Sequence, residues 1–143
     1  MIERDYLMRQ IQQLVAAVVR AITAAFNLQA EGRSEEALEA LSRIQRESFP
    51  GLDDGRRVEP DELRDACSPG GRFEPEIATA LADILRMRCS LQLDIGRLEE
   101  AEIAGRAALD LYRAAASVPA GLLPADIHER IRRVQEMLGD EAQ

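Results

Sequence analysis

Apolar residues recur at every third or fourth position along most of the chain, which is the spacing of one face of an α-helix. Prolines and glycines separate the apolar segments, at the points where helices are expected to end. No stretch alternates apolar and polar residues as a half-exposed strand does. The sequence therefore predicts an all-α fold with five long helices and one short one. The long helices are expected at about 3–30, 34–48, 75–95, 98–117 and 124–139, and the short one at about 60–66.

A hexapeptide of the form G-R-x-E-E-A occurs twice, at residues 32–37 and 96–101, each time between two predicted helices. Gly32 and Gly96 can each end a helix in the left-handed conformation that strains other residues. The two glutamates that follow fall in the first turn of the next helix, where the helix dipole favours negative charge, and Ser34 is expected to cap that helix. Both copies therefore indicate the tight turn of a helical hairpin within one domain, residues 1–143. Its expected parts are a first hairpin at about 3–48, an irregular insert at about 49–74, a second hairpin at about 75–117 and a capping helix at about 124–139.

The first predicted helix has an apolar arc about 140° wide, broader than one neighbouring helix covers. Val15, Val19 and Phe26 lie beside its main apolar stripe and form a candidate self-association face. Two-fold pairing is the commonest arrangement of identical chains, so a homodimer is expected. The alternative is that the 51–74 segment or the last helix covers this arc within one chain. The main stripe consists of Leu7, Ile11, Leu14, Val18, Ile22 and Ala25.

Composition narrows the classes of function. The net charge of −8 disfavours binding to a phosphate backbone, because such binding depends on cationic contacts. Cys67, Cys89 and His128 are the only cysteines and the only histidine, and their spacing matches no zinc motif and no disulfide framework. We therefore expect no metal, no cofactor and no disulfide, and no arrangement of nucleophile and base indicates an enzyme. The apolar run from Leu14 to Phe26 is only about a dozen residues long and contains Arg20, so no membrane insertion and a cytoplasmic location are expected.

A long helix, a tight G-x-x-E-E-A turn and a second helix with small inward residues together resemble the tetratricopeptide repeat (TPR). The similarity covers Gln92 to Ala115 best and Asn27 to Ile44 less closely. The two glycines are 64 residues apart instead of the expected repeat of about 34, so the insert would replace one regular unit. The opening segment from Glu3 to Ile11 also looks like the start of a small, uncharacterised bacterial family of TPR-like proteins. The resemblance implies TPR-like antiparallel hairpins in a small right-handed helical bundle.

The resemblance also implies a function, a non-enzymatic protein–protein interaction module that binds a peptide, a protein or a second copy of itself in a groove. The alternative is a small-ligand sensor or an unrecognised enzyme with a pocket between helices. On the helix at 75–95, the expected groove side carries Asp83, Arg86, Ser90 and Leu93, three or four residues apart. Arg86 is expected to hold a partner's carboxylate through two parallel hydrogen bonds, unless Asp83 and Arg86 form only a surface ion pair. The matching side of the first helix carries Val19, Ile22, Phe26 and Gln29.

Overall fold

The computed structural model describes residues 2–52, 57–119 and 123–139, and within these ranges all regular secondary structure is helical, which confirms the predicted all-α fold. The final helix begins three residues later than the Pro124 start expected from the sequence, because residues 124–126 form a turn. The described residues hold six α-helices and one short 3-10 turn. These are α1 (Ile2–Ala30), α2 (Ser34–Ser48), α3 (Pro60–Ala66), η1 (Pro69–Gly71), α4 (Pro75–Asp94), α5 (Leu98–Ala116) and α6 (Ile127–Met137).

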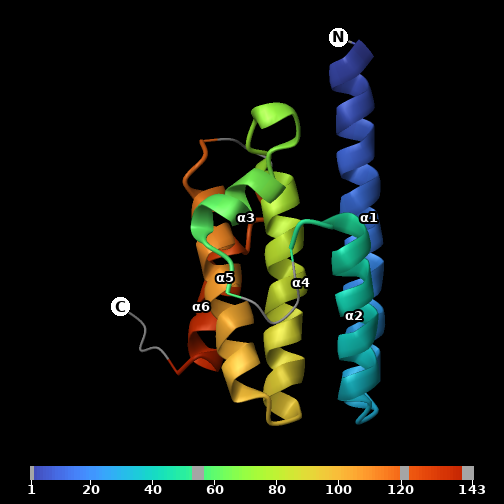
Figure 1. Cartoon of the computed structure of the whole chain (residues 1–143), viewed down its shortest axis with the longest axis vertical. Helices are drawn as coiled ribbons and strands as arrows, with labels where there is room; N and C mark the ends of the chain where they lie inside the picture. Colours follow the sequence, from blue (N-terminus) through green and yellow to red (C-terminus); the bar gives the residue numbers. More distant parts are fainter. Residues whose placement is uncertain (1, 53–56, 120–122, 140–143) are drawn as a thin grey trace.

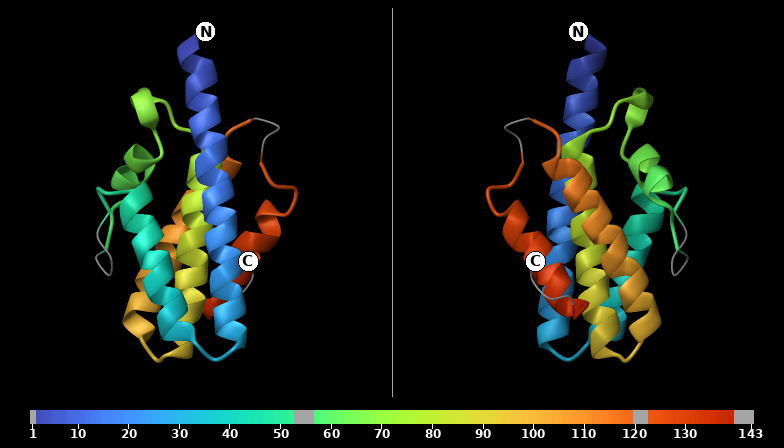
Figure 2. Two further views of the ribbon diagram at one scale, coloured as in Figure 1. Left: turned by 90° about the vertical axis from the view of Figure 1, so that its right-hand side faces the viewer. Right: turned by 90° about the vertical axis from the view of Figure 1, so that its left-hand side faces the viewer.

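Helix α4 runs through the middle of the molecule, with α1 and α2 on one side and α5 on the other (Figure 1). Helix α6 packs against α5 and also contacts α4, while α3 lies on α5. The N-terminal turns of α1 extend past the rest of the bundle (Figures 1 and 2). Because α4 has neighbours on most of its circumference, its buried positions include a run of six residues, 77–82, instead of one narrow stripe.

The two hexapeptide turns have the same backbone geometry. Gly32 and Gly96 adopt φ values of 76° and 79°, the left-handed conformation expected from the sequence. The next residue, Arg33 or Arg97, donates its backbone N–H to the carbonyl five residues earlier, at 2.8 Å in both turns. These bonds satisfy carbonyls that the end of a helix leaves without a partner. The two hairpins therefore end in the same glycine-dependent motif.

The expected capping role of Ser34 is wrong. Arg33 occupies the capping position of α2, and no side chain caps that helix. Ser34 is instead a buried residue of the first turn, and its Oγ donates to Asp94 Oδ2 at 3.1 Å. Gln29 Nε2 donates to the same oxygen at 2.7 Å and to Ser90 Oγ at 3.0 Å. The serine thus helps to join the first hairpin turn to the C-terminal end of α4, a long-range contact that a local capping rule does not consider.

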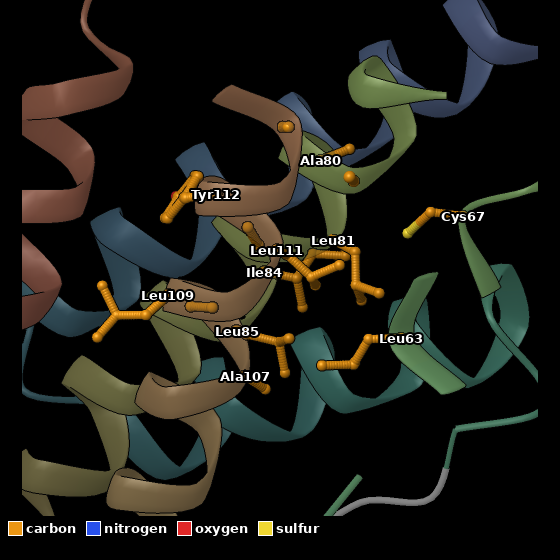
Figure 3. Close-up of a cluster of buried hydrophobic side chains, with 14 of the residues drawn as sticks. Leu63, Cys67, Ala80, Leu81, Ile84, Leu85, Ala107, Leu109, Leu111 and Tyr112 are labelled. Atoms are coloured by element: carbon orange, nitrogen blue, oxygen red, sulfur yellow. The ribbon is translucent and has the colours of Figure 1, made fainter. Parts of the chain in front are cut away.

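The core between α4 and α5 combines large side chains with small ones. Figure 3 shows Leu81 and Ile84 of α4 meeting Leu111 of α5, with Leu63 and Cys67 approaching from α3. On α5, Gly105 lies so close to its neighbours that an added Cβ would be 3.2 Å from Cys89 Sγ and 2.7 Å from Leu138 Cδ2. A small residue at this position therefore admits both α4 and the chain that follows α6.

We predict that Gly32→Ala and Gly96→Ala each lower the free energy of unfolding by about 1–2 kcal/mol, because alanine is strained in the left-handed conformation. A methyl group added at either glycine would meet no atom within 4 Å, so the backbone alone should set the effect. Urea denaturation followed by circular dichroism measures it. Gly51→Ala is the matched control, since Gly51 also has open space but no positive φ. Equal stability of all three variants would refute this account of the turns.

We also predict that both thiols are unreactive in the folded protein. Cys67 and Cys89 are free and have no exposed surface. Burial raises the pKa of Cys67 to about 12 and that of Cys89 to about 11, so neither forms the reactive thiolate near neutral pH. A thiol-specific colorimetric reagent at pH 8 should detect two thiols in denaturant and almost none without it. Rapid modification of either cysteine under native conditions would contradict the structure.

Candidate partner-binding groove

A groove lies between α1 and α6, and residues of α4 form its floor. Phe26 of α1 forms one wall, with 61% of its surface exposed. Met87 of α4 and Met137 of α6 supply the other apolar groups, and methionine side chains adapt readily to different ligands. Three charged side chains complete the lining together with Ser90. They are Arg86 of α4 and Arg133 and Glu136 of α6.

The groove contains two of the four residues predicted from the sequence. Arg86 and Ser90 line it, and Phe26 of the matching side of α1 does so as well. Asp83 and Leu93 do not line it: Leu93 packs against the hydrophobic core, and Asp83 faces α5 and α6. The groove therefore contains part of the expected side of α4 and, from the matching side of α1, Phe26, and its second wall is α6, which was not predicted to take part.

Asp83 is the centre of a polar network that joins three helices. Arg130 of α6 donates from Nη1 to both carboxylate oxygens, at 2.8 and 3.1 Å, and the hydroxyl of Tyr112 on α5 also donates to the carboxylate. The expected partner, Arg86, is 3.9 Å away, and its Nε donates instead to the Tyr112 hydroxyl at 3.1 Å. The principal ion pair of Asp83 is therefore with Arg130, not with Arg86.

The electrostatics of this network reflect its burial. Burial raises the pKa of Asp83, and the hydrogen bond from Tyr112 and the charges of Arg130 and Arg86 partly oppose that rise. Burial and the charge of Asp83 both raise the pKa of Tyr112, so the phenol stays protonated and remains a donor. Arg130 was not predicted from the sequence, although its spacing indicates a buried position. It lies between Ile127 and Val134 on the buried stripe of α6. A cation in such a position requires a partner.

The candidate self-association face on α1 is only partly covered. Val15 is half-buried, Val19 is 56% exposed and Phe26 is 61% exposed. The insert helix α3 packs on α5, and α6 reaches this face at the groove, beside Phe26. Most of the face therefore remains accessible along the described chain.

A second polar cluster lies on the other side of α4. Arg88 and Gln92 are buried there, and Arg88 Nη1 donates to Gln45 Oε1 of α2 at 2.7 Å. A small cavity beside them has a volume of about 30 Å³, which is room for a water molecule and not for a metabolite. Within the described ranges, no group of three or more His, Cys, Asp and Glu side chains is placed to hold a metal ion. His128 is exposed on α6.

Helix α1 is also long and apolar enough to cross a membrane. The apolar run predicted from the sequence covered only Leu14 to Phe26. The segment from Arg4 to Ala30 meets the criteria of length and composition for a membrane-spanning helix. It is the one such helix in the part of the chain that the structure describes. A single helix of this kind near the N-terminus is weak evidence for a membrane span, because core helices and signal sequences have the same properties.

In comparisons with known proteins, no protein-family model, no curated protein and no solved structure matches this chain.

We predict that Asp83→Ala destabilises the protein by about 2–3 kcal/mol, because it removes the less exposed of the two carboxylates that pair with Arg130 and leaves only the exposed Asp126. Arg130→Met in the same chain should restore part of this loss, since it removes the charge that has lost this partner. A double-mutant cycle measured by denaturant unfolding should give a coupling energy above about 1 kcal/mol. The exposed pair Glu102–Arg106 on α5 is the control, with an expected coupling below about 0.5 kcal/mol. Equal couplings for the two pairs would show that the network does not anchor α6.

Proposed function

We propose that this protein is a non-enzymatic interaction module with a TPR-like architecture, and that it binds a peptide segment of another protein in the groove between α1 and α6. The observation that carries the proposal is the exposed Phe26 at the mouth of a groove that also contains two methionines. Burying a phenylalanine side chain contributes about 1.5–3 kcal/mol, so a partner that covers Phe26 gains substantial free energy.

The arrangement of the hairpins supports the TPR-like part of the proposal. The groove of TPR proteins is built mainly from the first helix of each helical pair. Here α1 and α4 are the first helices of the two hairpins, they pack against each other, and both contribute to the groove. The second helices, α2 and α5, contribute no residue to its lining.

The charges of the groove indicate the chemistry of the partner. Arg86 and Arg133 lie in it beside a single acid, Glu136, so it is locally cationic on a chain with a net charge of −8. Arg133 is 61% exposed and is held by Glu129 at 3.3 Å, an exposed pair that a ligand carboxylate can replace at little cost. We therefore propose a segment that places one large apolar side chain beside Phe26 and a carboxylate beside the arginines. A cytoplasmic partner protein is consistent with this proposal.

A small-ligand sensor or an enzyme receives less support from the geometry. The small cavity beside Arg88 and Gln92 has no room for a metabolite. The groove itself is open and contains no histidine, cysteine or paired acids that would perform acid–base or nucleophilic chemistry.

A display library of random peptides, selected against the intact protein, tests this function. We expect the selected peptides to contain an aromatic or large aliphatic residue near an acidic one. Met137→Asp should weaken their binding at least tenfold, measured by fluorescence anisotropy, because a charge in the groove opposes burial of the apolar side chain. This variant is a cleaner probe than Arg86→Glu, since Arg86 also bonds to Tyr112.

His128→Asp is the matched control, because it places the same charge on an exposed position of α6 outside the groove. Circular dichroism should show unchanged helicity in both variants. If no peptide is selected, or if both variants bind the selected peptides equally, the groove is not a peptide-binding site.

A further inference from the structure

Helix α1 carries two parallel rows of residues with the spacing of a coiled-coil seam. In each row the positions are separated by alternating intervals of three and four residues, the pattern of helices that pack side by side. The first row packs into this chain: Ile11, Val18 and Ala25 are buried, and its other members, Leu7, Leu14 and Ala21, are half-buried. The second row, which we call the outer seam, consists of Met8, Gln12, Val15, Val19, Ile22 and Phe26.

None of the helices that the structure describes packs along the whole outer seam. Gln12, Val19 and Phe26 are exposed, and Met8, Val15 and Ile22 are half-buried by the edge of the core. Among the described helices, α6 approaches the seam at the groove, where Phe26 lies. The first three residues of the seam, Met8, Gln12 and Val15, lie in the N-terminal half of α1. Figure 1 shows the first turns of this helix extending past the bundle. The seam is thus a row of coiled-coil positions that lacks its second helix.

The spacing of the seam is symmetric. Read in either direction from its midpoint at position 17, the intervals between its six residues are the same. An antiparallel copy of the same helix therefore places Met8 opposite Phe26, Gln12 opposite Ile22 and Val15 opposite Val19. Such self-complementarity is the requirement for a two-fold interface between identical chains.

The charge distribution also allows a second copy to pack against this helix. The chain has 26 acidic residues, yet α1 has no Asp or Glu from Tyr6 to Ala30. Two copies with a net charge of −8 repel each other over most of their surfaces, and this helix is where they can meet without placing acids opposite acids.

We propose that two copies of this chain pair through their outer seams, with the two α1 helices antiparallel. The extended N-terminal end of each α1 then lies beside the groove of the other copy, and Met8 covers Phe26. In a parallel pairing, the two copies of Phe26 would face each other. The α6 helices of both copies, which lie beside Phe26, would then compete for space at the same end of the helix pair. The inference goes beyond the proposed peptide site, because only Phe26 belongs to both surfaces.

Sedimentation equilibrium between 1 and 100 µM tests the pairing, concentrations chosen to span about two decades around a micromolar dissociation constant. The wild-type protein should show twice the 15.9 kDa mass of one chain. Val19→Asp should raise the dissociation constant at least tenfold, because it places two carboxylates in the middle of the dry seam. Ala24→Asp is the matched control: Ala24 is exposed on the far side of α1 and should leave the dimer intact.

Cysteine cross-linking tests the orientation. In an antiparallel pair, the two copies of residue 8 are about 27 Å apart along the helix axis, at 1.5 Å per residue. Met8→Cys alone should therefore remain uncross-linked under mild oxidation, whereas a mixture of Met8→Cys and Phe26→Cys should form a covalent dimer. The native Cys67 and Cys89 are buried, and the wild-type protein serves as the background control.

Each contrary outcome has a distinct meaning. A wild-type monomer at 100 µM, or a dimer that Val19→Asp leaves unchanged, overturns the inference, and self-cross-linking of Met8→Cys overturns the antiparallel arrangement. Flotation of a monomeric wild-type protein with phosphatidylcholine–phosphatidylglycerol vesicles, lost in Val19→Asp, would assign the seam to a membrane surface instead. A monomer whose peptide binding still depends on Met137 would refute the dimer alone, while a wild-type dimer whose monomeric Val19→Asp variant binds no peptide would refute only the peptide site.

Discussion

The burial of α4 on most of its sides is the constraint on which the rest of the structure depends. A helix in this position can carry polar side chains only where another helix supplies a partner, because an unpaired polar group in the core is costly. Arg88 bonds to Gln45 of α2, and Asp83 binds Tyr112 of α5 and Arg130 of α6. Apolar packing brings these helices together, and the polar bonds fix how each of them sits against α4.

The same constraint explains why a groove exists. Arg130 fixes one end of α6 through Asp83, and at the other end Leu138 enters the space that Gly105 leaves open. With both ends held over α4 and α5, α6 stands beside α1 instead of covering it. The strip of α4 between them, which includes Met87 and Ser90, becomes the floor of the groove. The position of the candidate site thus follows from two contacts that lie outside it.

The sequence predicts the features that depend on neighbours along the chain. The helices and the left-handed glycines at 32 and 96 belong to this group, because periodicity and backbone sterics act over a few residues. It fails where distant segments compete for a group. Ser34 bonds to Asp94, 60 residues away, instead of capping its own helix, and Asp83 binds Arg130, 47 residues away, instead of its neighbour Arg86. The second wall of the groove lies outside such local rules: resemblance paired α1 with α4, but nothing local placed α6 beside them.

Phe26 connects the two proposed interactions. It is the exposed aromatic group of the groove, and it is also the last residue of the outer seam. A peptide side chain and Met8 of a second copy cannot both cover its ring, so each ligand lowers the population of the state that binds the other. Thermodynamic linkage then requires the effect to be reciprocal: dimerisation weakens peptide binding by the same factor by which peptide weakens the dimer. In an interaction module of this kind, binding of a partner would dissociate the dimer. The concentration of the chain would determine how tightly the partner must bind to dissociate it.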